Sequence, residues 1–269
     1  MKSYGTISTP INGRNQNYYI EEIYNKGFTI INSQIKDSVS LSLFRKKIKS
    51  IYQKQIIGFH IKDLERIGDL NTVRCPMAYD EYFLKFVKMR IIKNIVKNIL
   101  GTNFHLILQN GIINAAGSKH HQSSWHRDLP YQNYTTSKPI ALSIYFTLNN
   151  YNKNNGGIIL LPGSHKMDSL PSKKYLKNNY FQVFCPAGSA IVFDSFLFHK
   201  AGLNNSKTDR IGINHVFALP IIKQQICLKS IFKDKYKNDT YLNKIMGYEY
   251  DTPKNVDEFR LKKIKALKK

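Results

Sequence analysis

The feature that most constrains this fold is a change in sequence texture at Phe104. From there to Leu219, short apolar or alternating runs are separated by segments rich in Gly, Asn and Pro. The runs span Phe104 to Leu108, Ile140 to Leu148, Ile158 to Leu161, Ala190 to Phe193 and Gly212 to Leu219. Short strands separated by turn signals are typical of an antiparallel β-sandwich or jelly roll. We therefore predict a mainly β core of the jelly-roll type in this part of the chain.

The N-terminal part of the chain shows helical periodicity instead. Apolar residues recur at helical spacing between Asp37 and Lys54. The same spacing follows Asp80, a suitable N-cap, up to a stop signal at Gly101. A shorter helix is expected over Ile20 to Lys26, followed by a strand over Phe28 to Ile31. The apolar faces of the two longer helices are expected to pack against a sheet, because amphipathic helices normally bury such a face.

No internal repeat or low-complexity linker interrupts the 269 residues, so the sequence predicts a single α+β domain over 1–269. Within it, residues 1–103 form a mostly helical prelude, whose helices flank the core, and residues 104–220 form the jelly-roll core itself. Residues 221–269 form a C-terminal helical extension. Thr252 and Pro253 mark the start of its last helix, which runs into a basic tail over Arg260 to Lys269.

Three residues within the β region have the character of metal ligands. His126 and Asp128 are separated by one residue, so in an extended segment both side chains project from the same side. His199 follows later in the chain and can converge with them at the mouth of a barrel. Two imidazoles and one carboxylate leave coordination positions open, as in the facial triad of non-haem Fe(II) oxygenases. Arg210 can supply a fixed cation for an anionic cosubstrate.

Several segments of the chain resemble one protein family. They are Trp125-His126-Arg127-Asp128, Asn155 to Lys166, Pro186-Ala187-Gly188-Ser189, and Phe198 to Ser206 leading to Arg210. In these motifs the chain resembles the phytanoyl-CoA dioxygenase family of Fe(II)- and 2-oxoglutarate-dependent oxygenases, and the resemblance covers most of the chain. It implies that the predicted jelly roll is a double-stranded β-helix of the cupin-like kind.

The resemblance also implies a role for each motif residue. His126, Asp128 and His199 would be the catalytic iron ligands. Arg210 would pair with the distal carboxylate of 2-oxoglutarate, a task that suits a guanidinium because it stays charged and can form two parallel bonds. Tyr145 lies on the strand where relatives often carry a large aromatic residue near the cosubstrate. The implied cofactors are therefore Fe(II), 2-oxoglutarate and O2.

The implied reaction is hydroxylation of a small-molecule metabolite, with release of succinate and CO2. Halogenating relatives need a small residue at position 128, so the carboxylate of Asp128 favours hydroxylation. The segment from His120 to Thr136 surrounds the first two ligands, and we expect some of its polar groups to contact the substrate. At Ala201 the chain departs from the many relatives that place Ser or Thr beside the 2-oxoglutarate carboxylate. A metal- or metabolite-binding jelly roll without oxygenase activity therefore remains the alternative interpretation.

The formal charge of +23 raises the question of a nucleic-acid partner. The basic residues are spread along the whole chain, which indicates compositional drift rather than a binding patch. Only Arg260 to Lys269 concentrates them, with six of the 41, and we interpret this run as a solvated tail. A nucleic-acid-modifying oxygenase is thus the less favoured interpretation, whereas an anionic small-molecule substrate suits the charge. The sequence does not indicate an oligomeric state.

The cysteines, the lack of long apolar runs and the N-terminal segment indicate in which cellular compartment the protein is expected. Cys75, Cys185 and Cys227 share no tight spacing, which favours reduced thiols over a disulfide framework or a zinc site. No run of 18 apolar residues occurs, so no membrane span is expected. The segment Met1 to Asn15 is polar and does not resemble a secretory signal. These features together predict a cytoplasmic protein.

Four other conspicuous side chains have less specific interpretations. His165 lies in a Pro-Gly-Ser-His-Lys turn, where we expect it to shape the loop rather than bind metal. Asp194 is expected to bond backbone or solvent near the mouth of the barrel. Trp125, the only tryptophan, either walls the pocket or packs under the sheet. His215 lies on a strand near the site and could face either the cavity or the outside.

Overall fold

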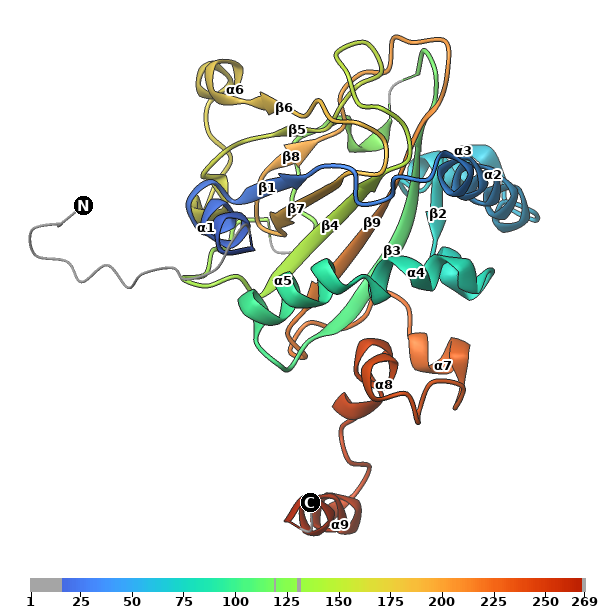
Figure 1. Ribbon diagram of the computed structural model, residues 1–269, viewed down its shortest axis with the longest axis vertical. Coiled ribbons are helices and arrows are strands. Elements are labelled where there is room, and N and C mark those ends of the chain that lie inside the picture. The colour runs from blue at the N-terminus through green and yellow to red at the C-terminus, as the bar shows by residue number, and fades with distance from the viewer. Residues whose placement is uncertain (1–15, 119, 130–131, 268–269) are drawn as a thin grey trace, which may run out of the picture.

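The computed structural model describes residues 16–118, 120–129 and 132–267 of the chain. Within them, a six-stranded and a three-stranded antiparallel sheet are surrounded by helices (Figure 1). The prediction of a mainly β core with flanking helices is confirmed.

The larger sheet crosses the whole molecule and carries most of the residues discussed below. Its strands are β1 (Phe28–Ile31), β2 (Thr72–Arg74), β3 (His105–Asn114), β4 (Ala141–Thr147), β7 (Ala190–Asp194) and β9 (Arg210–Ala218). They run in the order β1-β7-β4-β9-β3-β2, and all neighbours are antiparallel. In the central pair, Tyr145 lies opposite Asn214 and Ile144 lies opposite His215. Since strand side chains alternate, each pair occupies one face of the sheet.

The smaller sheet lies over the inner face of the larger one. It has β5 (Ile159–Leu160) at its centre, flanked by β6 (Phe181–Gln182) and β8 (His199–Lys200). An isolated antiparallel bridge between His126 and His199 extends it. Leu160 and Val183 from this side pack with Ile191 and Phe193 of the larger sheet in one buried cluster. The two sheets thus enclose a space that is lined from both sides.

Several helices cover the other face of the larger sheet, whereas α6 (Lys173–Asn179) lies beside the smaller sheet (Figure 1). The bounds of the other helices are α1 (Gln16–Lys26), α2 (Ser38–Gln55), α3 (Ile61–Arg66), α4 (Leu84–Lys88), α5 (Arg90–Leu100), α7 (Leu228–Phe232), α8 (Thr240–Met246) and α9 (Val256–Leu267). Phe44 of α2 and Phe86 of α4 are in the same core cluster as Ile144 and Phe146 of β4. The rings of Phe86 and Phe146 lie 4.7 Å apart. The prediction that the α2 stripe packs against a sheet is confirmed.

The predicted helix from Asp80 to Gly101 is wrong as one continuous element. Asp80 caps a single 3-10 turn, Glu81–Phe83, and α4 then ends at Met89, whose backbone is extended. Phe83 and Phe86 pack around Phe44 in this stretch. The helix restarts as α5, which carries the apolar stripe up to the stop at Gly101. Aromatic packing beneath α4 thus overrides the continuous periodicity that the sequence suggested.

Several short elements have no sequence signal that we recognised. They are α3, α6, α7, α8, β2, β6 and β8. Most of them span between two and seven residues. Periodicity needs a longer window to be recognised, so tertiary pairing rather than local pattern defines these elements.

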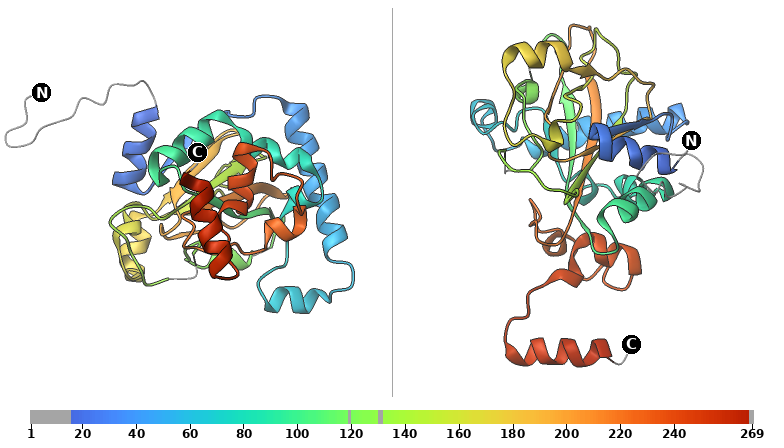
Figure 2. Two further views of the ribbon diagram at one scale, coloured as in Figure 1. Left: turned by 90° about the horizontal axis from the view of Figure 1, so that it is seen from below. Right: turned by 90° about the vertical axis from the view of Figure 1, so that its left-hand side faces the viewer.

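The C-terminal part of the chain lies beneath the larger sheet. Leu228 of α7 and Leu242 and Ile245 of α8 are buried in the main core cluster. Helix α9 begins within the predicted last helix and stands apart from the rest of the molecule (Figures 1 and 2). Among the helices that the structure describes, none is both long and apolar enough to traverse a bilayer.

Candidate metal centre

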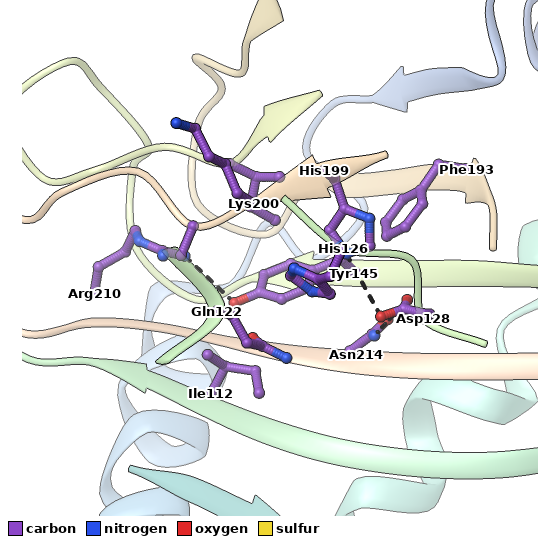
Figure 3. Close-up of a pocket in the computed structure, with 12 residues that line it drawn as sticks. Ile112, Gln122, His126, Asp128, Tyr145, Phe193, His199, Lys200, Arg210 and Asn214 are labelled. Carbon is purple, nitrogen blue, oxygen red and sulfur yellow. Dashed lines mark hydrogen bonds and ion pairs between the residues drawn. The ribbon is translucent and has the colours of Figure 1, made fainter. Parts of the chain in front are cut away.

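The structure brings His126, Asp128 and His199 together, although His199 is distant in sequence. Their donor atoms all lie within 4.8 Å of one another (Figure 3). The backbones of His126 and His199 exchange two N–H to O hydrogen bonds of 3.0 Å, and the Asp128 N–H donates to Ser195 O at 3.1 Å. Backbone pairing therefore fixes the three side chains on the inner side of the smaller sheet.

The two imidazoles present the same nitrogen to the centre. His126 Nδ1 lies 2.9 Å from Ser124 O, and His199 Nδ1 lies 2.9 Å from Leu197 O. These carbonyls accept from Nδ1–H, which leaves Nε2 of each ring with its lone pair directed inward. His126 Nε2 is buried and has no hydrogen-bond partner among the described residues. Two such nitrogens and one carboxylate oxygen fit a first-row divalent metal ion.

Asp128 is held by two polar side chains that the sequence analysis missed. Its Oδ2 accepts from Ser143 Oγ at 2.5 Å and from Asn214 Nδ2 at 3.0 Å. Its Oδ1 lies 3.5 Å from His199 Nε2. Ser143 interrupts the apolar start of β4, and Asn214 follows an apolar residue in β9, and these polar positions within predicted strands are the signal that could have identified them.

The electrostatic environment favours an ionised Asp128 carboxylate beside a neutral His126 ring. Burial alone would raise the pKa of Asp128, but His199 and the hydrogen bond from Ser143 hold it below its usual range. Burial and the neighbouring His199 lower the pKa of His126 to about 4. Burial acts to lower the pKa of His199 as well, yet Asp128 raises it above the ordinary value. His126 is therefore neutral at pH 7, which is the form that binds metals.

Arg210 lies at one end of this site, on the inner face of β9. Its side chain is only 1% exposed, and Nη1 donates to the hydroxyls of Tyr151 at 2.6 Å and Tyr145 at 3.4 Å. The guanidinium carbon also lies 4.6 Å from the centroid of the Tyr151 ring. Its Nε is buried and unpartnered among the described residues. A buried cation with a free N–H and no carboxylate is suited to bind an anion.

Tyr145 owes its position to a glycine on the next strand. A Cβ atom at Gly212 would come within 2.1 Å of the Tyr145 ring, so only glycine leaves room for it. Tyr151, by contrast, is placed by an isolated bridge to Cys185 and was not identified from sequence. It follows the predicted strand and lies in a segment without periodicity, so no local pattern marks it.

Ala201 lines the same cavity as the three donor residues and Arg210. Its N–H donates to Gln122 O at 2.8 Å, and its side chain offers no hydroxyl. The hydroxyls that face Arg210 are those of Tyr145 and Tyr151. The structure therefore places two phenols on the cation, whereas the family pattern would place a Ser or Thr two residues after His199.

Arg127, between the first two donors, points away from the centre. Its guanidinium donates to the carbonyls of Gln132, Tyr134, Ser164 and Met167. The side-chain amide of Gln132 in turn accepts from Arg127 N through Oε1 and donates through Nε2 to Arg127 O and Leu129 O. Both side chains therefore hold the loop that follows Asp128. Tyr131 of the same loop lies outside the described residues.

The remaining conspicuous side chains are accounted for by packing. Asp194 is buried and accepts from Phe196 N at 2.9 Å, so it bonds backbone as predicted. His215 lies on the opposite face from Asn214, against Phe86 and Phe146. It therefore faces the helices rather than the cavity. His165 lies 3.3 Å from Tyr24 O in its turn.

Comparison with known proteins gives a family match and a distant relative that agree on phytanoyl-CoA dioxygenase. A family model for phytanoyl-CoA dioxygenase matches residues 24–212. An uncharacterised protein of Mycobacterium tuberculosis is 29% identical over 240 residues, 87% of each chain. The peroxisomal phytanoyl-CoA dioxygenase of Bos taurus is 22% identical over 222 residues, 71% of this chain and 65% of its own.

Solved structures share the fold at low sequence identity. The non-haem monooxygenase ThoJ, in a nickel complex, matches with a TM-score of 0.58 and 16% identity over 77% of this chain and 80% of its own. The epimerase SnoN, in complex with Fe3+, alpha-ketoglutarate and nogalamycin RO, matches with a TM-score of 0.59 and 11% identity. That match covers 76% of this chain and 84% of SnoN. The prediction of a jelly-roll core is thereby confirmed.

Proposed function

The chain belongs to the phytanoyl-CoA dioxygenase family, and from this premise we propose that it is an Fe(II)- and 2-oxoglutarate-dependent dioxygenase. In the proposed reaction it hydroxylates a small-molecule metabolite and releases succinate and CO2. The observation that carries the proposal is the convergence of three donor atoms within 4.8 Å, with a buried arginine on the same side of the sheet. The SnoN structure, which has this fold, contains iron and alpha-ketoglutarate together and supports the choice of cofactors.

In this proposal His126, Asp128 and His199 hold the iron. The orphaned Nε2 of His126 and the ionised carboxylate of Asp128 are the groups that fit it best. Bound there, Fe(II) would supply the redox chemistry that couples decarboxylation of a 2-oxo acid to oxidation of a C–H bond. Ser143 and Asn214 fix the carboxylate through Oδ2, so that Oδ1 remains available on the side of His199. The carboxylate at position 128 also supports hydroxylation over halogenation.

Arg210 binds the distal carboxylate of 2-oxoglutarate in the proposed complex. Its unpartnered Nε and its nearly complete burial support this role, because an anion would complete the hydrogen bonds of the guanidinium. The hydroxyls of Tyr145 and Tyr151 position the cation and take the place of the hydroxyl that Ala201 lacks. The departure at Ala201 is then compatible with cosubstrate binding.

The substrate is proposed to bind on the opposite side of the metal from Arg210. A cavity of about 520 Å³ there includes Asp128 and Leu108 in its walls. Leu108 pairs with Val216 near one end of β9, whereas Asn114 pairs with Arg210 at the other end. Half of the residues that line this cavity are aliphatic, and Lys223 is a cation in its wall that suits an anionic group of the substrate.

The decisive experiment is an assay for coupled turnover. Purified protein is loaded anaerobically with Fe(II) and 2-oxoglutarate, mixed with a metabolite extract and exposed to O2. Mass spectrometry should then show succinate and one product that gains a single oxygen atom. Asp128→Ala should abolish both, whereas His60→Ala, at an exposed helix start, should leave both unchanged. Iron binding without succinate from any extract would contradict the proposal and support the binding-module alternative.

A further inference from the structure

A second cavity, of about 430 Å³, lies on the outer side of the smaller sheet, beneath α6. Its position follows from strand alternation, since Trp125 precedes His126 and Lys200 follows His199. The side chain of Lys200 runs away from the cluster of His126, Asp128 and His199 (Figure 3). Lys200 also contributes to the lining of the cavity that contains the three donor residues, so the two cavities share this residue. The other six residues that line the outer cavity do not line the metal centre, so we expect a ligand held by them to lie outside it.

One side of this outer groove is apolar and aromatic. Trp125, Ile159, Leu176 and Tyr180 contribute to its lining. Trp125 and the buried Leu176 belong to one small apolar cluster, which holds the indole in place. The volume exceeds that of a simple oxyanion and falls in the range of small-molecule sites. The groove can thus accept the ring of an organic molecule as well as a charged group.

The other side of the groove carries three lysines and no acid. Lys173 and Lys177 come from successive turns of α6, where residues four apart share a face, and Lys200 comes from β8. The Lys200 ammonium lies 5.1 Å from the centroid of the Trp125 indole. None of the three lysines has an ion-pair partner among the described residues.

The surrounding sequence supplies little negative charge to balance these lysines. Between Leu129 and Thr208 the chain has eight lysines, and its only acids are Asp168 and Asp194. Asp194 is buried and bonded to backbone, so it does not reach the groove. Among the described residues six lysines pair with a carboxylate, as Lys49 does with Asp209, and most other lysines do not, so the lack of a partner alone does not set the groove apart. The unpaired cations converge here beside an aromatic wall, which distinguishes the groove from an ordinary basic surface.

We propose that this groove is a binding site for an anionic aromatic small molecule, of the aryl phosphate class. Its phosphate group contacts Lys173, Lys177 and Lys200, because ammonium groups bind phosphate oxygens strongly. Its ring packs against Trp125, and the Lys200 ammonium completes the contact as a cation over the indole. Apart from Lys200, the residues of this site are distinct from those that line the proposed iron, cosubstrate and substrate positions.

The single tryptophan makes this proposal directly testable, because Trp125 lines the groove and its emission should respond to a ligand bound there. Metal-free, full-length protein is titrated with phenyl phosphate, with inorganic phosphate and phenol as separate arms. A saturable change in emission is expected with phenyl phosphate, with binding at least about tenfold weaker for inorganic phosphate and for phenol. The titration requires no turnover, so its outcome is independent of the oxygenase assay.

Matched variants assign the signal to the lysines. Lys173→Gln/Lys177→Gln should weaken phenyl phosphate binding at least about tenfold, since two charge-assisted contacts are lost. Lys174→Gln, on the same helix but outside the groove lining, should change it less than about twofold. Circular dichroism checks that these exposed substitutions leave the fold intact. An absent or non-saturable response, equal binding of inorganic phosphate, or equal weakening by Lys174→Gln would overturn the proposal.

Discussion

At the scale of single residues, the site is built from polar side chains that each have a defined partner. Ser143 and Asn214 fix Asp128, while carbonyl oxygens fix the Nδ1 side of each imidazole. Metal ligands with such partners hold their orientation before the metal arrives, which lowers the cost of binding it. The same logic applies to Arg210, which two phenolic hydroxyls orient.

The hydroxyl of Tyr151 can be tested by its removal. Tyr151→Phe leaves the ring over the guanidinium but removes the 2.6 Å hydrogen bond to Arg210 Nη1. Because hydrogen bonds to charged groups contribute about 1.5 to 3 kcal/mol, the KM for 2-oxoglutarate should rise about tenfold or more, with a smaller change in kcat. Tyr79→Phe, at an exposed position, is the control. An unchanged KM would show that the hydroxyl does not orient Arg210.

Asp194 predicts a pH dependence of stability that does not involve the metal site directly. Burial raises its pKa to about 6, against about 4 in an unfolded chain. Between these pH values the folded state retains a proton that the unfolded state has released, so stability should fall as pH rises from about 4 to about 6.

Asp194→Asn isolates this effect, because the amide oxygen can still accept from Phe196 N. Above pH 6 the variant should be more stable than the original chain by about 2 to 3 kcal/mol, and the two should converge near pH 4. Urea unfolding at several pH values measures the difference. A constant difference across this range would show that Asp194 does not titrate as described.

At the scale of elements, most of the long strands and helices were readable from sequence, whereas of the short elements only a few, such as β1, were. The apolar runs that became β4, β7 and β9 and the stripe of α2 are long enough to show periodicity. Strand β8 spans two residues and exists only because His199 pairs with Leu160 and bridges to His126. The triad residues were predicted from residue type and family resemblance, whereas Tyr151 could not be, since its position depends on a bridge to Cys185.

The contact between β4 and β9 can be tested at Gly212. An alanine there would place Cβ within 2.1 Å of the Tyr145 ring, so Gly212→Ala should destabilise the protein by about 1 to 3 kcal/mol. In a Tyr145→Ala background the ring is gone, and the same substitution should cost much less. A double-mutant cycle by urea unfolding measures this coupling. Equal costs in both backgrounds would exclude the ring as the cause.

At the scale of the whole molecule, the site occupies the space between the sheets, and the C-terminal helix lies far from it (Figure 2). Phe259, Leu261 and Ile264 of α9 are all exposed. A helix that buries so little apolar surface contributes little to the stability of the core. Among its basic residues, Lys262 donates to Asp251 O in the segment that precedes the helix.

Removal of residues 252–269 tests this separation. The truncated protein should keep its Tm within about 2 °C and retain its affinity for metal, because Leu242 and Ile245 of α8 still close the core. Thermal unfolding and a Co(II) titration provide the two measurements. A fall of many degrees would mean that the tail packs against the body in solution.

The backbone bridge between His126 and His199 has a consequence for how such a protein can diversify. The bridge joins two distant parts of the chain at the candidate metal centre, so the loops between the two histidines project from a fixed base. Insertions at the tips of those loops, for example near Asn155, would lengthen the loop without altering the spacing of the two imidazoles. The geometry of the candidate metal centre is therefore insulated from length changes in the loops around it, which leaves those loops free to be remodelled for new ligands.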